Sequence, residues 1–352
     1  MVIGAHIWGK DVEESLLLFA LKKTASLQPA IKVIFFTNSP LDNLPQNCVQ
    51  VYIYPRPTNN ILLYYWYNYK LPKLLLKYNI NLFFSNVGML ASGISIKQFL
   101  FIEHKDLFEE RNSFCKKRLS TGVEIAQTVF VIDNVIGENI SNQFPATKDK
   151  IQLLNFSLNE SSSLFTLKDI KGVREKYTTG FDFYLFRVDE ISKAHILTLL
   201  KSFSKLKKWQ KTAVKMIMLF ENDIDEKLLP DFKNYKYRDE VVLLKETDKN
   251  LSLLTAAAFA YIYFGNYKSR DNVYRALQYN IPVIAADTII NNLLFKTAVC
   301  YTVASVDGLA LQLQLIYKDE VYRKQLLQKS TIYLTNFDSI SASQKFAEVV
   351  SN

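Results

Sequence analysis

The chain has 352 residues, a formal net charge of +9 and a hydrophobic share of 49%. This length suits two domains of ordinary size, and so large an apolar share predicts well-packed cores and excludes a wholly disordered chain. Three cysteines, Cys48, Cys115 and Cys300, lie far apart, a pattern that predicts neither a disulfide framework nor a zinc site and is typical of a reducing cytosol.

The apolar segments and the positive charge limit the cellular setting. No apolar run reaches the ~18 residues that a spanning helix needs, and residues 1–6 enter a strand without the basic start of a signal peptide. We therefore expect a cytoplasmic protein. Basic clusters at 115–118 and 205–211 are expected on helices, where they are either solvated faces or sites of attraction to the inner face of an anionic membrane or to a polyanionic substrate. No helix-turn-helix, RRM-type or zinc signature accompanies them, which argues against nucleic-acid binding.

The first 160 residues alternate short apolar runs with stretches of helical periodicity. A helix expected at 12–23 has Glu13 and Glu14 in its first turn, where acidic residues complement the helix dipole. The segment 61–78 is a long aromatic-rich helix that Pro72 should kink or split. Its aromatic stripe either packs in a core or between domains, or forms a sugar-stacking or membrane-facing surface. The other elements expected here are a helix at 107–127 and strands at 2–7, 31–37, 49–54, 81–85, 99–103, 128–132 and 150–155.

The second half of the chain repeats this alternation. Buried strands separated by helices predict parallel sheets, so the expected fold class is α/β, with two doubly wound, Rossmann-like domains. A polar break at 159–163 places the domain boundary near residue 160, and the last segment, 341–350, is amphipathic. The expected strands are 181–186, 214–220, 241–244, 259–264, 282–286 and 298–303, and the expected helices are 192–209, 225–235, 251–257, 272–279, 291–295, 308–317 and 320–335.

The loop at 265–272 is the first candidate for a binding site. It joins the apolar strand 259–264 to the helix 272–279. In parallel sheets, ligands gather where the carboxyl ends of strands meet the amino ends of helices, and backbone N–H groups there favour anions.

Three motifs carry a family resemblance. Residues 150–155 read K-I-Q-L-L-N, residues 184–195 read Y-L-F-R-V-D-E-I-S-K-A-H, and residues 282–285 read P-V-I-A after a strand, a loop and a helix. In this order they resemble motifs of the GT-B glycosyltransferases, in particular the large retaining family 4. The resemblance implies two Rossmann-like domains that face a cleft, namely 1–160 on the acceptor side and 161–336 on the nucleotide-sugar donor side, with a helix in 337–352 packing back on the first domain.

The same resemblance implies an activity. Such an enzyme moves a hexosyl group from a nucleotide diphosphate sugar to a glycan, lipid or other acceptor, with retention of configuration. The family needs neither a metal nor a cofactor. The expected partners are therefore the nucleotide-sugar donor and a glycan or lipid-linked acceptor. The sequence leaves open whether the protein also makes peripheral contact with a membrane surface.

The resemblance also assigns roles to single residues. Arg187 and Lys193 match the cations that lie on the donor diphosphate, where fixed positive charge stabilises a leaving group. The alternative is a surface Arg and Lys beside Asp189 and Glu190. His104 follows a strand at a position that would face the donor sugar in the family, or it is a structural histidine.

Two residues of the donor loop depart from the family pattern. Tyr267 and Arg275 stand where family members have two glutamates that hold the sugar and the ribose, and an arginine can only donate hydrogen bonds. Arg275 could contact phosphate instead, or pair with Asp271, while Asn272 could offer its backbone N–H to a phosphate.

The missing glutamates leave a second function open. In that alternative the chain is a catalytically inactive GT-B relative that acts as a binding or scaffolding partner of an active glycosyltransferase. A remote third alternative is another GT-B-shaped enzyme, such as a sugar-nucleotide epimerase. The sequence Asp223-Ile224-Asp225 could suggest a metal-dependent transferase, but its context predicts the cap and acidic first turn of a helix, and we expect no metal.

Overall fold

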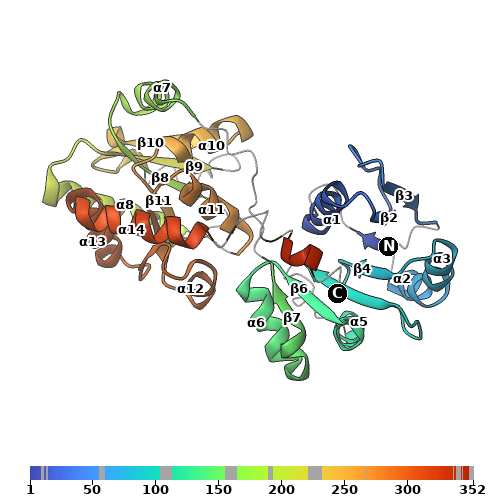
Figure 1. Cartoon of the computed structure of the whole chain (residues 1–352). Coiled ribbons are helices and arrows are strands. Elements are labelled where there is room, and N and C mark those ends of the chain that lie inside the picture. The colour runs from blue at the N-terminus through green and yellow to red at the C-terminus, as the bar shows by residue number, and fades with distance from the viewer. Residues whose placement is uncertain are drawn as a thin grey trace. The chain divides into compact units, whose positions relative to one another are not determined.

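The computed structural model describes most of the chain, which divides into two compact units. Unit 1 comprises Met1–Ser157 with Phe337–Asn352, and unit 2 comprises Leu158–Asn336 (Figure 1). The boundary expected near residue 160 lies outside the described residues. These are residues 1–8, 12, 15–54, 60–103, 113–154, 165–188, 193–220, 232–265, 267–335, 337, 342 and 344–348.

Unit 1 is built on a seven-stranded parallel sheet with the order β3-β2-β1-β4-β5-β6-β7. The order reverses once, between the adjacent strands β1 and β4, where the helical connections leave in opposite directions. The strands are β1 (Val2–Ile7), β2 (Lys32–Thr37), β3 (Cys48–Tyr52), β4 (Leu82–Ser85), β5 (Lys97–Ile102), β6 (Thr128–Val131) and β7 (Ile151–Leu153). The helical elements are α1 (Leu16–Leu27), α2 (Asn60–Tyr65), the π-helical turn η2 (Trp66–Lys70), α3 (Leu71–Lys77), α5 (Ser113–Ile125), α6 (Asn134–Gln143) and the 3₁₀ helix η3 (Pro145–Lys150).

Both faces of this sheet are buried, which explains why its strands are apolar runs and not alternating ones. One face packs against α1 through residues such as Leu18 and Leu21. On the opposite face, the side chains of Phe36 and Phe83 contact the rings of Trp66 and Tyr67 from η2.

The start of α1 differs from the expectation. The helix begins at Leu16 and not at residue 12, and its first turn has no acidic residue; Glu13 and Glu14, expected there, precede the helix and lie outside the described residues. Ser15 caps the helix, and the carboxylate of Glu103, which follows β5, accepts from the Ser15 hydroxyl at 2.7 Å. The same carboxylate accepts from the backbone N–H groups of the next two residues, each at 3.2 Å. A buried acid distant in sequence therefore supplies the negative charge that a helix amino end favours.

The segment expected as one helix at 61–78 is split, as the proline predicts. Pro72 occupies the first turn of α3, where its missing N–H costs little, and the five residues before α3 form the π-helical turn η2. The wider turn places the rings of Trp66 and Tyr67 in the core, while Tyr64, Tyr65 and other aromatics of the stripe are exposed. The stripe is thus both core and surface.

The C-terminal segment returns to unit 1. The ring of Phe346 is fully buried and lies 5.2 Å from the ring of Phe84 and 5.3 Å from that of Phe130, measured between centroids. Helical residues 344–348, red in Figure 1, therefore complete the face of the sheet that α1 covers.

Unit 2 is built on a six-stranded parallel sheet with the order β10-β9-β8-β11-β12-β13. Its order also reverses once, between β8 and β11. Helices α8, α13 and α14 contribute to the core on one face of the sheet. The strands are β8 (Phe183–Val188), β9 (Lys215–Phe220), β10 (Val241–Lys245), β11 (Ala260–Tyr263), β12 (Val283–Ala286) and β13 (Cys300–Thr302). The helical elements are α7 (Leu167–Thr178), α8 (Lys193–Gln210), η4 (Arg238–Glu240), α10 (Asp248–Ala257), η5 (Tyr267–Ser269), α11 (Arg270–Gln278), α12 (Ile289–Phe295), α13 (Val306–Lys318) and α14 (Glu320–Leu334).

His6 makes the stability of unit 1 sensitive to acid. Burial lowers the pKa of its imidazole from 6.5 to about 3. Between these values the unfolded chain binds one proton more than the folded chain, so the free energy of unfolding should fall as the pH is lowered, by about 1.4 kcal/mol per pH unit. Denaturant unfolding between pH 6 and pH 4 should approach this slope, and His6→Gln should reduce it. Tyr67→Phe, which keeps the imidazole buried, should keep the slope; an equal slope in the wild type and His6→Gln would contradict the prediction.

Substitution of Phe346 tests whether the C-terminal segment packs on the sheet of unit 1. Phe346→Ala should lower the free energy of unfolding of unit 1 by about 3–5 kcal/mol, because it leaves a cavity among three buried phenylalanines. The control Phe181→Ala removes a ring that is 45% exposed in unit 2 and should cost less than about 1 kcal/mol. Equal costs for the two variants would show that the segment does not stay packed on the sheet.

Candidate functional site

The polar residues predicted for donor binding lie at the carboxyl edge of the unit 2 sheet. Arg187 is the last residue but one of β8, and the segment with Tyr267 and Asn272 follows β11. Because β8 and β11 are neighbours at the reversal of strand order, these groups border the crevice in which open α/β sheets bind ligands.

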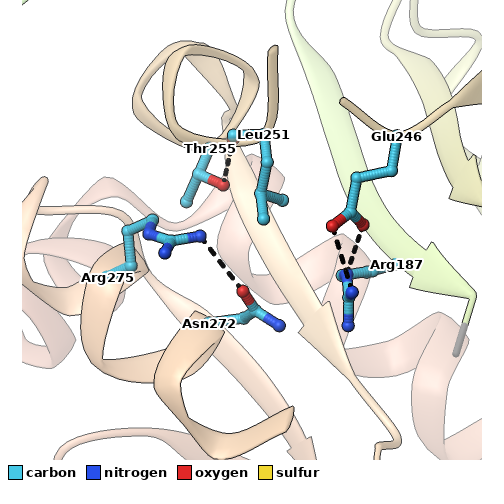
Figure 2. Close-up of polar contacts among 6 residues, drawn as sticks. All are labelled: Arg187, Glu246, Leu251, Thr255, Asn272 and Arg275. Carbon is cyan, nitrogen blue, oxygen red and sulfur yellow. Dashed lines mark hydrogen bonds and ion pairs between the residues drawn. The ribbon is translucent and has the colours of Figure 1, made fainter. Parts of the chain in front are cut away.

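Arg187 is held by a carboxylate that the sequence did not point to. Its Nε and Nη2 atoms donate to the two oxygens of Glu246, the second at 3.0 Å, so that the pair forms a fork (Figure 2). Glu246 follows β10, and its backbone N–H donates to the carbonyl of Phe220 at the end of β9. The two side chains are only 12% and 14% exposed. The fork uses two of the five guanidinium N–H groups and fixes the plane of the remaining ones.

A second polar pair comes from α11. Arg275 donates from Nη1 to the side-chain oxygen of Asn272 at 3.2 Å (Figure 2). Asn272 is buried in the first turn of the helix, one turn before Arg275. The neighbouring acid, Asp271, forms its ion pair with Arg270 at 3.9 Å. The first turn of α11 thus contains the Arg270–Asp271 pair, while Arg275 lies in the last turn and is tied to the first turn through Asn272.

Tyr267, at the position of the first family glutamate, is buried at 5% exposure. The guanidinium carbon of Arg270 lies 4.1 Å from the centre of its ring, and the same guanidinium donates to the Tyr267 carbonyl at 3.2 Å. The turn before it is tight, because a Cβ atom added to Gly265 would lie 2.3 Å from the Ser269 hydroxyl and 2.7 Å from the Tyr263 ring. The loop between β11 and α11 is therefore a packed structure with an arginine stacked on a tyrosine.

Several predicted residues cannot be placed in this geometry. His104 and the Asp223–Asp225 sequence lie outside the described residues, and Lys193 is described only as the first residue of α8, without its side chain. Over the described part of the chain, no cluster of three or more His, Cys, Asp or Glu residues could hold a metal ion. None of the described helices is both long and apolar enough to cross a membrane.

The reversal point of unit 1 is also marked by polar groups. His6 of β1 and Ser85 of β4 are register partners, and Tyr67 bridges them: its hydroxyl lies 2.6 Å from His6 Nδ1 and 2.7 Å from Ser85 Oγ. All three side chains are fully buried. Beyond the strand ends, the side chain of Asn86 accepts from the N–H of Trp8 at 2.9 Å and donates to its carbonyl at 3.3 Å. The loops that follow β1 and β4 are thereby joined.

A pocket of ≈350 Å³ opens beside this network. Its walls come from three places in unit 1: Tyr64 and Asn68 of the α2–η2 segment, the loop after β4, and the exposed side of α5. The volume falls within the range of small-molecule sites, about 300–1,000 Å³. The sequence analysis did not identify this pocket, because no motif marks residues that meet only through folding.

The chain matches no protein-family model and no curated protein. Solved structures do resemble it over its whole length. HepE from Anabaena, in complex with UDP and glucose, has a TM-score of 0.66 at 15% identity, covering 100% of this chain and 99% of that chain. Sucrose-phosphate synthase from Thermosynechococcus elongatus has a TM-score of 0.65 at 12% identity, covering 100% and 98%. The lipopolysaccharide outer core galactosyltransferase WaaB has a TM-score of 0.66 at 12% identity, covering 100% of both chains.

Likeness at these identities establishes the fold. The two parallel sheets and the agreement over nearly the whole of these solved chains confirm the predicted fold class: two doubly wound α/β domains of the GT-B type.

Proposed function

We propose that the protein is a glycosyltransferase that takes its sugar from a nucleotide diphosphate sugar bound at the carboxyl edge of the unit 2 sheet. The observation that carries this proposal is the oriented guanidinium of Arg187 at the strand reversal, beside the amino end of α11. The solved structures of HepE, which contain UDP, UDP with glucose, or UDP-glucose, make a uridine donor the first candidate.

In this proposal Arg187 neutralises the charge that develops on the diphosphate as the sugar leaves. Glu246 acts as a positioning residue, because its fork holds the guanidinium in one plane, and oriented donors stabilise developing charge better than freely rotating ones. Lys193, at the start of α8 after the same strand, is the proposed second cation on the diphosphate. The proposal also keeps two expectations from the resemblance: a role of His104 toward the donor sugar, and transfer with retention to a glycan or lipid-linked acceptor.

The two absent family glutamates change how the donor is held. Tyr267 and Arg275 stand in place of the two carboxylate acceptors, and the guanidinium of Arg275, a donor only, suits phosphate oxygens better than sugar hydroxyls. Contacts to the sugar would then come mainly from other groups, and the selectivity for one hexose over another should be modest. Asp271 and Tyr267 line the same segment and complete the proposed donor loop.

Titration calorimetry of the full chain with UDP, GDP and ADP tests the donor site. One nucleoside diphosphate should bind, and Arg187→Ala should lower the affinity for it by about 10–100-fold, which is the effect expected when a charge-assisted hydrogen bond is lost. The matched control is Arg174→Ala, which removes an arginine paired with Asp182 at 2.7 Å just before β8, at the opposite edge of the same sheet. That variant should bind the nucleotide as the wild type does.

Binding of none of the three nucleotides would contradict the donor site and favour the non-catalytic alternative. Equal weakening by Arg187→Ala and Arg174→Ala would show a general effect of charge or stability, and would remove Arg187 from the site. Thermal unfolding of both variants, measured without ligand, separates a loss of folding from a loss of binding.

A further inference from the structure

The pocket of unit 1 is built on a rigid frame. The carbonyl and N–H of Ala91, in the loop after β4, are both bonded to the buried side-chain amide of Gln98, at 2.7 and 3.0 Å. The same loop touches α5 directly, since a Cβ atom added to Gly122 would lie 2.6 Å from the carbonyl oxygen of Gly88. Gly88 itself has φ = 71°, a conformation that glycine adopts without strain. The loop and the helix therefore define a preformed cavity.

The lining of the pocket combines positive charge with hydrogen-bonding groups. Lys117 and Arg118 of α5 form one wall, and the lining residues that belong to the described part of the chain include no aspartate or glutamate. On the facing side, the hydroxyl of Ser92 donates to the Asn68 side-chain oxygen at 2.8 Å, and the Asn68 amide nitrogen donates to the Tyr64 carbonyl at 2.9 Å. Asn68 is thus held in one orientation.

Arg118 connects this wall to the buried network at the strand reversal. Burial raises the pKa of the Tyr67 phenol far above its ordinary value, and the nearby charge of Arg118 acts in the opposite direction. Arg118 therefore joins the pocket wall to the surroundings of the Tyr67 hydroxyl, which bonds to His6 of β1 and Ser85 of β4 at the strand reversal, where open α/β sheets place their ligands.

From these observations we infer that the pocket binds a sugar that carries a phosphate or a carboxylate. The anionic group would lie against Lys117 and Arg118, since arginine presents a planar fork to either oxyanion and lysine adds a point charge. The hydroxyl groups of the sugar would face Asn68, Ser92 and Thr121, and Met89 would contact its apolar side. This inference rests on the proposed function insofar as it makes the anionic sugar the acceptor substrate.

The test is calorimetric titration of the full chain with three sugars that differ only at one carbon: glucose 6-phosphate, glucuronic acid and glucose. At least one of the anionic sugars should bind, and glucose should bind about 10-fold more weakly or not at all. Comparison of the phosphate with the carboxylate shows which anion the pocket prefers.

Three variants locate the binding. Lys117→Glu reverses an exposed charge on the pocket wall, and Thr121→Trp fills the cavity from an exposed position of α5. Each variant should lower the affinity for the anionic sugar by about 10-fold or more. Lys73→Glu makes the same charge change on α3, outside the pocket lining, and should leave binding unchanged. None of the three should change the affinity for UDP.

The inference is overturned if neither anionic sugar binds, if glucose binds equally well, or if Lys117→Glu and Thr121→Trp have no larger effect than Lys73→Glu. The nucleotide titration keeps the two proposals apart. If UDP binds and neither anionic sugar does, the proposed donor site stands and the acceptor pocket is refuted. If an anionic sugar binds and UDP does not, the acceptor pocket stands and the proposed donor site is refuted.

Discussion

Each sheet of this protein reverses its strand order once, and this constraint fixes where polar chemistry can occur. A parallel strand that is covered on both faces is mostly apolar along its length, as the buried runs 82–84 of β4 and 283–286 of β12 show. At the reversal the covering helices diverge, and the strand ends become accessible. Arg187 and Asn272 in unit 2, and His6 and Ser85 in unit 1, all lie at these two places.

The two reversal points use their polar groups in different ways. In unit 1, the His6–Tyr67–Ser85 network is buried and neutral, and its role is to join strand ends and to support the loop that shapes the pocket. In unit 2, the fork between Arg187 and Glu246 keeps full charges at low exposure, which is costly unless both partners are hydrogen-bonded. Because an apolar pair could stabilise the fold equally well, the presence of this charged pair supports the proposed binding role of Arg187.

The repetitive part of the fold could be predicted from the sequence. Continuous apolar runs such as 214–220 and 282–286 predict doubly buried strands, and the structure has β9 and β12 there. Boundaries that depend on distant groups could not be predicted. The start of α1 moves to Leu16 because Ser15 and Glu103, 88 positions apart, bond to each other. The split at Pro72, by contrast, follows from the residue itself and was predictable.

The candidate sites show the same division. The loop around Asn272 could be located, because strand, loop and helix follow one another in the sequence. Glu246 could not be identified from the sequence, since its partner Arg187 lies 59 positions away and no motif connects the two residues. The pocket of unit 1 was also hidden, because it depends on the contact of Gly88 with Gly122 between a loop and a helix.

Hydrogen–deuterium exchange with and without UDP tests the central claim most directly, because it reports where a nucleotide sits on the intact chain. Our account predicts slower exchange in two segments of unit 2, namely the residues around Glu246 after β10, and residues 267–275 of η5 and α11, with little change at β1 and β4. Protection confined to unit 1, or no protection at a concentration of UDP that saturates binding, would contradict the claim that the reversal point of unit 2 is the donor site.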